Sequence, residues 1–462
     1  MIDDECGRQL PALTVFSLSI RYMKEDLEKT CENQVVGLKP DDIHWVLTVP
    51  AIWNDSAKQF MRMAAEQAGI STDKLSVALE PEAASLYCRH LPVMCDGESS
   101  LLTFQTGKKY LVLDAGGGTI DITVHEVCAG GNLKEIHRAS GGDWGGTKID
   151  GSFMNFLGHI AGNTAMQRFK DENMEDFIEL LRDFEIKKRN IDSVSKTKVT
   201  IKVPSSLFDL VQEKLHSSGY ENQVNLTGTG NKVRLDADLM RSFFTTTLTQ
   251  IITHTSDLLE KPDCVGVEAI LMVGGFSESK LLQEIVKMMF SQLKIIVPPE
   301  AGLAVLKGAV IYGHCPTAIT ERISKYTYGV ATSVKFNEKI HPSSKRLVLD
   351  DGSIICEDVF DIIVKEGDRL VVGVAHKERS YKPIDESQKT IEFPVFISRD
   401  RNANFVTDLG CKHVGTLAIP LAGRGTDRSV TVRMLFGGTE IIVECVEQAT
   451  SRIRRLKIDF LT

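Results

Sequence analysis

The alternation of hydrophobic and polar positions predicts helices and strands in the first hundred residues of the chain. Apolar side chains recur at helical spacing over residues 11–34, which predicts one long helix. The apolar run over residues 43–49 ends at Pro50 and predicts a buried strand, and the run Leu75–Leu79 predicts a second one. Residues 91–108 are polar and rich in turn-forming residues, so we interpret them as a linker.

Two further helices are expected beside these strands. Asn54 or Asp55 has the side chain of a helix-capping residue and begins the first of them. Pro81 suits the first turn of the second helix, because proline lacks the N–H group that this turn leaves unpaired. Glu80 therefore lies where a strand passes into a helix.

Between residues 109 and 315, apolar runs alternate with glycine turns and helical patterns. A long helical region includes residues 185–190, and strands and helices alternate as far as residue 260. The clearest elements are a strand–turn–strand unit at Tyr110–Val127, a third strand at 133–139, a strand at Val267–Val273 followed by a helix to Phe290, a strand at 294–297 and a helix ending near Tyr312.

The pattern changes after His314. Short segments of alternating polar and apolar residues, separated by glycine, proline and Asp-Gly turns, continue to Thr462. This spacing is typical of a β-sandwich. We therefore expect three segments, in which residues 1–108 and 109–315 form an α/β region and residues 316–462 form a separate β-rich domain.

The composition supports an α/β protein of several domains and argues against some functions. The 462 residues, of which 42% are hydrophobic, suffice for about two to four domains with large cores. The 54 basic and 62 acidic residues are interspersed and give a net charge of −8. This balance argues against general binding to nucleic acid or to a membrane surface.

The cysteines and the N-terminus indicate a cellular location. Ten cysteines are scattered along the chain without a Cys-x-x-Cys pair, which is typical of reduced intracellular thiols rather than of disulfides or zinc. The first residues are acidic and lack the basic-then-apolar order of a signal peptide. No apolar run reaches the roughly 18 residues of a membrane span. We therefore expect a cytoplasmic or nuclear protein.

The segment Asp114–Asp121 has the side chains expected of a phosphate-binding turn between two strands. Three consecutive glycines permit a left-handed backbone and leave no Cβ between the amides and a ligand, at Gly116, Gly117 and Gly118. Successive N–H groups of such a turn form a concave site for anionic oxygen, and the Thr119 hydroxyl adds a donor. Asp114 and Asp121 are suited to hold Mg²⁺ through water. The alternative is an ordinary glycine hairpin of a sheet.

Two more glycine pairs lie beside predicted strands, at Gly145–Gly146 and Gly274–Gly275. A nucleotide that is held between two subdomains is contacted by several loops that are far apart in sequence. Together with the aspartates and the threonine of the first turn, these pairs favour phosphate binding over an ordinary hairpin.

Charged side chains supply two further candidate parts of a nucleotide site. Glu185, Lys188 and Arg189 lie on one helical face, which can contact a ribose and flank an adenine, because Lys and Arg stems pack on aromatic faces. The alternative is a solvated charged helix. Glu80 is placed to orient a water for attack on a γ-phosphate, and the alternative is a carboxylate that stabilises a helix N-terminus.

These motifs together resemble the actin-like (ribonuclease H-like) ATPase domain of the 70-kDa heat-shock protein family, and in particular the divergent twelfth subgroup of that family. The resemblance covers about residues 40–315 with specific motifs and the β-rich remainder more loosely. The segments that carry it are Leu47–Asn54, Glu80–Ala84, Asp114–Asp121, Gly145–Gly146, Glu185–Arg189, Gly274–Gly275, Pro299–Ala301 and Gly308–Ala309.

The resemblance implies that ATP with Mg²⁺ binds between two lobes. Glu80, Asp114 and Thr119 would have catalytic roles, and Asp114 with Asp121 would hold Mg²⁺ through water. The nucleotide would contact the glycines of the three turns and the Glu185–Arg189 helix. A chaperone-like role in the stress response is also implied, with protein or peptide clients on the β-rich domain and co-chaperones as further partners.

The chain departs from the family in two places. The family's first phosphate loop, of Asp-x-Gly-Thr-Thr type, and the lysine after it are absent from the 462 residues, so we expect a truncated first lobe and little or no ATP hydrolysis. Glu278 stands near the position of the family's adenine-stacking arginine, which predicts weak discrimination between ATP and GTP. The alternative is that another residue, such as Phe276, supplies the stacking surface. An upstream start that supplies the Asp-x-Gly-Thr-Thr loop would restore the expectation of an ATPase. A start at Met1 would favour the alternative function, a non-catalytic interaction protein.

Overall fold

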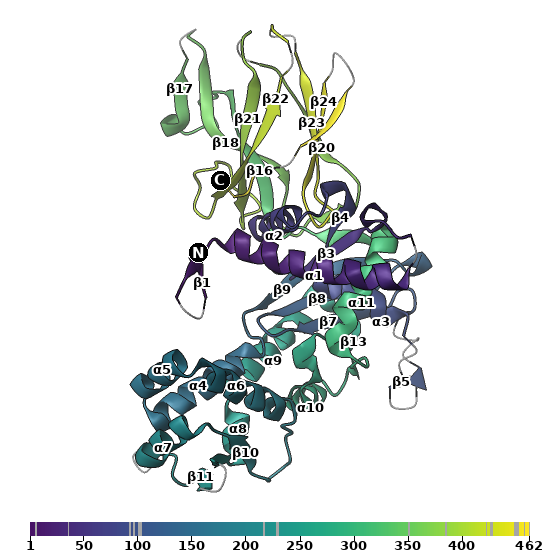
Figure 1. The fold of residues 1–462 in the computed structure, drawn as a ribbon. Coiled ribbons are helices and arrows are strands. Elements are labelled where there is room, and N and C mark those ends of the chain that lie inside the picture. Colours follow the sequence, from purple (N-terminus) through teal and green to yellow (C-terminus); the bar gives the residue numbers. More distant parts are fainter. Residues whose placement is uncertain are drawn as a thin grey trace.

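The computed structural model shows a mixed α/β protein with a β-rich C-terminal part (Figure 1). Among the residues that it describes, no helix is long and apolar enough to cross a membrane. It describes residues 1–462 except for 5–6, 36, 92–93, 96–97, 100–103, 216–217, 228–230, 350–351, 384–385, 422, 426–427, 448–451, 457 and 462.

The first segment contains the helices and strands that its sequence pattern predicts. Its elements are β1 (Ile2–Asp3), β2 (Gln9–Leu10), α1 (Ala12–Gln34), β3 (Trp45–Val49), α2 (Asp55–Gln67), β4 (Leu75–Leu79) and α3 (Glu80–Arg89). Asn54 caps α2, because its side chain accepts a hydrogen bond from the Ala57 N–H at 2.9 Å. Strands β3 and β4 pair in parallel, so Glu80 begins α3 directly after a buried strand.

The predicted linker over residues 91–108 lies partly outside the described residues. Its described part includes two short antiparallel strands, β5 (Met94–Cys95) and β6 (Glu98–Ser99). After this segment the chain enters the central sheet at Lys109.

A seven-stranded sheet forms the centre of the molecule, in the order β14-β13-β7-β8-β9-β15-β19. Alternate side chains of β7 enter two cores, with Leu111 and Leu113 on one face and Tyr110 and Val112 on the other. The predicted strand–turn–strand unit is confirmed as β7 and β8, which are antiparallel, and β13 runs parallel to β7. The strands are β7 (Lys109–Ala115), β8 (Ile120–Val127), β9 (Leu133–Gly142), β13 (Val267–Val273), β14 (Lys294–Ile296), β15 (Ile319–Ile323) and β19 (Arg369–Val371).

Helices pack on both faces of this sheet. Buried residues of α3 and α11 share the core that contains Tyr110, whereas buried residues of α4, α9 and α10 share the core that contains Leu111. Helix α11 approaches α3 so closely that a Cβ on Gly308 would lie 1.7 Å from the Ala83 carbonyl oxygen, which explains the glycine. The α-helices between residues 147 and 314 are α4 (Thr147–Ala161), α5 (Asn163–Glu172), α6 (Met174–Arg189), α7 (Ser205–Lys214), α8 (Ala237–Ser242), α9 (Thr245–Leu259), α10 (Lys280–Met289) and α11 (Ala304–His314).

A small antiparallel sheet lies at the far end of the lobe that carries α4 to α9 (Figure 1). Its strands are β10 (Val199–Lys202), β11 (Val224–Thr227) and β12 (Lys232–Leu235).

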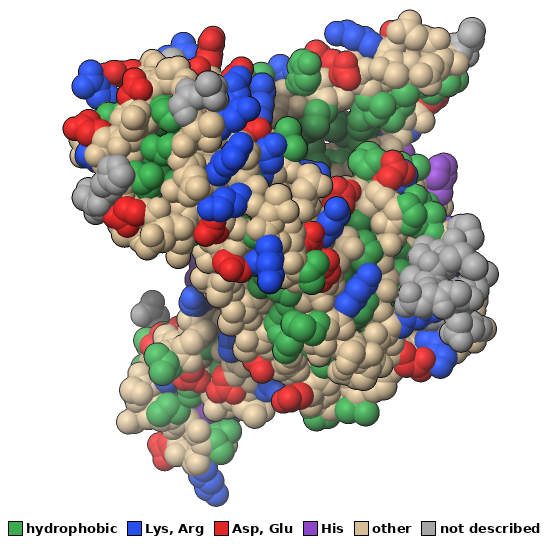
Figure 2. Space-filling view, turned by 90° about the horizontal axis from the view of Figure 1, so that it is seen from below, with side chains coloured by type: hydrophobic (Ala, Val, Ile, Leu, Met, Phe, Trp, Pro, Cys, Tyr) green, Lys and Arg blue, Asp and Glu red, His purple; other side chains and the backbone are tan. Residues whose placement is uncertain are grey.

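On the face of the molecule that Figure 2 shows, Lys and Arg side chains form a short row, but acidic and hydrophobic side chains lie beside them. The mixed charges on this face agree with the interspersed charges in the sequence.

The C-terminal part consists of two antiparallel sheets whose buried side chains share one hydrophobic core. Their strands are β16 (Thr327–Lys335), β17 (Arg346–Val348), β18 (Ile354–Val364), β21 (Thr390–Ser398) and β22 (Lys412–Pro420) in one sheet, and β20 (His376–Tyr381), β23 (Val430–Leu435), β24 (Ile442–Glu447) and β25 (Ile453–Leu456) in the other. Strands β15 and β19 follow position 315 but extend the central sheet, so residues on both sides of the predicted boundary share that sheet.

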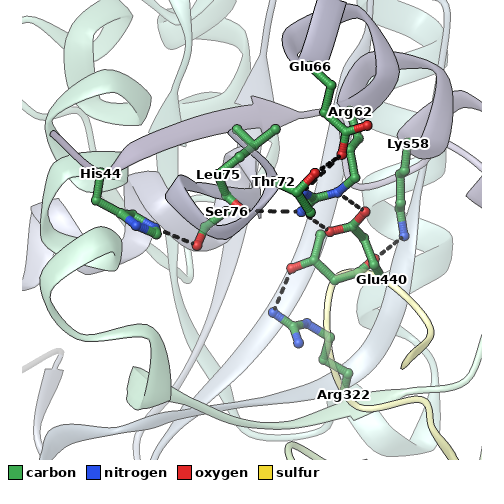
Figure 3. Close-up of polar contacts among 10 residues, drawn as sticks. His44, Lys58, Arg62, Glu66, Thr72, Leu75, Ser76, Arg322 and Glu440 are labelled. Carbon is green, nitrogen blue, oxygen red and sulfur yellow. Dashed lines mark hydrogen bonds and ion pairs between the residues drawn. The ribbon is translucent and has the colours of Figure 1, made fainter. Parts of the chain in front are cut away.

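Polar contacts hold the C-terminal part against α2 (Figure 3). Arg62 of α2 donates to both carboxylate oxygens of Glu440, at 2.5 and 2.6 Å. Lys58 donates to the Thr439 carbonyl at 3.2 Å, and Arg322 of β15 donates to the Thr439 hydroxyl at 3.5 Å. The loop between β23 and β24 is therefore tied to the first segment and to the central sheet.

Candidate functional site

The glycine turn after β7 is tight, but its backbone differs from the expectation. The Gly116 N–H donates to the Thr119 carbonyl at 3.0 Å and closes the turn between β7 and β8. The prediction of a left-handed backbone here is wrong, since Gly116–Gly118 are absent from the residues with positive φ. A Cβ on Gly117 or Gly118 would meet no described atom within 4 Å. These two glycines therefore leave open space above the turn, where a ligand can approach the backbone.

A second glycine turn is hydrogen-bonded to the first one. The successive N–H groups of Gly145–Thr147 donate to the carbonyls of Gly118, Gly116 and Gly117, at 3.2, 3.1 and 2.8 Å. A Cβ on Gly145 would lie 2.3 Å from the Gly117 oxygen, so the two turns touch through their backbones and require glycine there. The carbonyls of the first turn are thus engaged by protein, and the two predicted turns form one rigid unit.

Three carboxyl groups gather beneath this unit. Asp114 of β7 and Asp121 of β8 are directly opposite each other in the strand pair, and Glu80 enters from the start of α3. Burial, and then the charge of Asp121, raise the pKa of Glu80 to about 7. Burial, and then the charges of Glu80 and Asp121, hold the pKa of Asp114 well above its ordinary value. The charges of Glu80 and Asp121 therefore make it harder for Asp114 to ionise, and the charge of Asp121 does the same for Glu80.

Asp121 and Asp114 differ in their hydrogen bonds. The Ile52 N–H donates to Asp121 at 2.7 Å, and the Thr119 hydroxyl donates to its other oxygen at 3.1 Å. Burial raises the pKa of Asp121, and these hydrogen bonds oppose the shift. The Oδ2 atom of Asp114 is buried and has no partner among the described residues. Thr119 is thus turned toward Asp121 in this structure.

The carboxyl cluster fits a hydrated divalent cation. No group of three His, Cys, Asp or Glu side chains in the described part of the chain is arranged to bind a metal directly. A Mg²⁺ ion that keeps its water shell suits the unpartnered oxygen of Asp114 and would offset the repulsion among the three acids. Its positive charge would neutralise phosphate oxygens at the adjacent turn.

The helix face that carries Glu185, Lys188 and Arg189 is folded into ion pairs. Lys188 is 6% exposed and donates to Asp150 at 2.7 Å and to the Gly146 carbonyl at 3.2 Å, and its Nζ lies 2.6 Å from Glu185. Arg189 donates to Glu185 at 2.8 Å. Lys188 therefore joins α6 to the second glycine turn and to the first turn of α4, where Asp150 lies.

The third glycine pair approaches the carboxyl cluster from β13. Gly274 has a φ of +85°, and a Cβ there would lie 2.4 Å from the Asp114 carboxylate, so a side chain would collide with the cluster. Gly275 begins the short 3₁₀ helix η7 (Gly275–Glu278), and a Cβ on it would meet nothing within 4 Å. Gly274 thus packs against the acids, while Gly275 faces open space.

One cavity of about 250 Å³ joins these motifs. Among the predicted site residues it is lined by Gly117, Gly146, Glu185, Lys188, Arg189 and Gly275. Glu80, Asp114, Gly116, Gly118, Thr119, Asp121, Gly145 and Gly274 lie outside the lining, and they support it from the turns and the carboxyl cluster. The cavity therefore has a glycine-rich end suited to phosphate and a charged helical end suited to a sugar and base.

Four lining residues were not among the predicted site residues: Thr147, Asp150, Phe276 and Ser279. Thr147 and Asp150 lie in the first turn of α4, and their polar side chains directly after Gly145–Gly146 were the available signal. Phe276 is 7% exposed and follows the third glycine pair, where the sequence suggests it only as an alternative surface for stacking on a base.

Comparisons with known proteins identify a family. The family model described as Hsp70 protein matches residues 2–341. The chain is similar to human Heat shock 70 kDa protein 12A, with 34% identity over 98% of this chain and 76% of the relative. It is also similar to human Heat shock 70 kDa protein 12B, with 33% identity over 99% of this chain and 76% of the relative. The Chaperone protein dnaK of Guillardia theta is 24% identical over 84% of this chain and 57% of that protein.

Proposed function

Because this chain belongs to the Hsp70 protein family, we propose that it binds ATP with Mg²⁺ in the cavity between its glycine turns and α6, and that its β-rich part engages a protein partner. Proteins of this family in general bind ATP with Mg²⁺. The mixed α/β architecture is consistent with the actin-like ATPase fold. In this proposal the first lobe is a truncated one, and the two C-terminal sheets form a β-sandwich.

The cavity is the observation that carries the proposal. It brings together Gly117, Gly146 and Gly275 from three turns with Arg189 of α6, although these positions are separated by up to 158 residues in the sequence. Open space above Gly117 and Gly275 suits the close approach of phosphate and sugar to the backbone. The carboxyl cluster with the unpartnered Asp114 oxygen supplies the place for hydrated Mg²⁺.

A client or regulatory partner is proposed for the β-rich part. Its contacts with α2, through Arg62 and Glu440 and through Lys58, link it physically to the lobe that carries Glu80 (Figure 3). A chaperone-like or regulatory protein with this layout would respond to nucleotide through that link. Protein or peptide clients, with co-chaperones as further partners, remain the proposed binding partners.

The rate of ATP hydrolysis distinguishes an ATPase from the alternative, a non-catalytic interaction protein. The 462 residues contain no Asp-x-Gly-Thr-Thr loop and no lysine after it, so one side of the phosphate clamp is missing from this chain. Loss of one clamp commonly costs several orders of magnitude in rate. We therefore propose that this chain binds ATP and hydrolyses it weakly or not at all.

Calorimetry with ATP, in the presence and absence of Mg²⁺, tests the proposal. We expect binding that weakens sharply without Mg²⁺ and that is lost in Gly275→Val, because Gly275 lines the cavity and a Cβ there would meet no described atom within 4 Å. Gly151→Ala, on an exposed turn of α4, is the matched control and should bind as the parent does. Failure of the parent protein to bind ATP would refute the proposed function. Hydrolysis as fast as in an intact family member, and abolished by Glu80→Ala, would refute the weak turnover.

A further inference from the structure

Arg189 closes the charged end of the cavity by bridging two carboxylates. Its Nε donates to Glu185 at 2.8 Å, and its NH1 group donates to Glu278 at 3.2 Å. Glu185 lies one turn earlier on α6, whereas Glu278 ends the 3₁₀ helix η7 on the opposite side. The arginine side chain therefore spans from α6 to η7.

Glu278 is itself held in place by the backbone. Its second carboxylate oxygen accepts a hydrogen bond from the Gly302 N–H at 3.2 Å, and an ideal Cβ on Gly302 would lie 3.1 Å from this oxygen. Because one oxygen is fixed by Gly302, the other is directed toward Arg189. The bridge thus joins a carboxylate anchored on the Gly302 backbone to a guanidinium anchored on α6 through Glu185.

The bridge competes with a bound base for the guanidinium of Arg189. A free guanidinium stacks on an aromatic face, but one held between two carboxylates has its donors and its charge already engaged. The carboxylate of Glu278 offers no compensating attraction, because the face of an aromatic ring is itself negative. The exposed fractions of Arg189 and Glu278, 53% and 39%, make the bridge a solvent-accessible one that can open at small cost.

We propose that Glu278 withholds Arg189 from the base, so that this site holds nucleotides by their phosphates and is nearly indifferent to the base. The inference rests on the proposed nucleotide function and goes further, because it assigns the weak base recognition to one ion pair. Neutralising Glu278 removes one of the two carboxylates that hold Arg189, so that the guanidinium is tied only to α6 through Glu185 and can turn toward a purine, while the phosphate end of the cavity is unchanged.

The variant Glu278→Gln tests the inference. The amide oxygen of Gln still accepts the Gly302 N–H, so the loop keeps its anchor, but the ion pair with Arg189 is lost. Affinities for Mg²⁺ complexes of ATP, GTP and inorganic tripolyphosphate are measured by calorimetry, and tripolyphosphate reports the phosphate end alone. The matched control is Glu268→Gln. Glu268 lies on β13, outside the cavity lining, and the variant removes its exposed ion pair with Lys108.

We expect Glu278→Gln to bind ATP and GTP about two- to fivefold more tightly than the parent, the range of one exposed cation–π contact, with tripolyphosphate unchanged. Glu268→Gln should alter none of the three affinities. Unchanged ATP affinity in Glu278→Gln would overturn the inference and leave the proposed function standing. An equal gain for ATP and tripolyphosphate would also overturn it, because overall charge would then account for the effect. Absence of binding for all three probes to the parent would overturn the proposed function, and this inference with it.

Discussion

The charge of Glu80 should destabilise the ligand-free fold at neutral and higher pH, so Glu80→Gln should stabilise that fold. Burial and the nearby Asp121 raise the pKa of Glu80 from 4.5 to about 7 in the folded protein. In the unfolded chain the pKa returns to its ordinary value. A group with a raised folded-state pKa favours folding while it is protonated, so this contribution is complete below pH 4.5 and is lost as the pH rises through 7.

Proton linkage sets the size of the effect. With these two pKa values, ionisation of Glu80 lowers the free energy of unfolding by about 1 kcal/mol at pH 5 and by about 3 kcal/mol at pH 8. Glutamine has the shape of the neutral carboxyl group and does not titrate. Glu80→Gln should therefore raise the free energy of unfolding by about 3 kcal/mol at pH 8 and by only about 1 kcal/mol at pH 5.

Urea unfolding of the ligand-free, Mg²⁺-free protein measures this difference. Trp45 and Trp53 lie in the same part of the chain as Glu80 and report its unfolding by fluorescence. Glu268→Gln, which removes an exposed carboxylate, should show no comparable dependence on pH. A gain of equal size at pH 5 and pH 8 would mean that packing rather than charge is responsible. A loss of stability at pH 8 would refute the electrostatic reasoning altogether.

The close contact of the two glycine turns should not tolerate a side chain, so Gly145→Val should abolish ATP binding in calorimetry, whereas Gly151→Ala should not. Unaltered affinity in Gly145→Val would contradict the role of these turns. The buried pair of Glu82 and Arg322, with two contacts of 2.7 Å, predicts a loss of about 3–5 kcal/mol in Glu82→Gln by denaturant titration, since the buried guanidinium loses the carboxylate with which it pairs. A loss below about 1 kcal/mol would count against this, because it is typical of an exposed pair.

Local sequence signals predicted the elements and the family well. The strand Leu75–Leu79, the helix cap at Asn54 and the strand–turn–strand unit at β7 and β8 are confirmed. Period-2 and helical apolar spacing report directly which side chains are buried, and capping depends on neighbours along the chain. The resemblance to the 70-kDa heat-shock proteins is confirmed by the family match. It could be recognised from the sequence because its motifs are short and local.

The backbone of the first glycine turn was not predictable from its composition. Three glycines suggested positive φ, but Gly116–Gly118 keep negative or extended backbone. Their carbonyls accept hydrogen bonds from Gly145–Thr147, and this tertiary contact, rather than the freedom of glycine, sets the turn. Glycine is needed at Gly145 and Gly274 for a different reason, which is the lack of room beside another backbone or carboxylate.

By itself, the sequence determined the order of helices and strands, the glycine turns and the residue types of a nucleotide site, because each depends on near neighbours in the chain. The tertiary structure decided which of these residues share a cavity, that Arg189 pairs with Glu278, and that β15 and β19 extend the central sheet. These outcomes depend on contacts between residues far apart in sequence. The geometry of such contacts is fixed only when the helices pack on the sheet and bring their charged faces together.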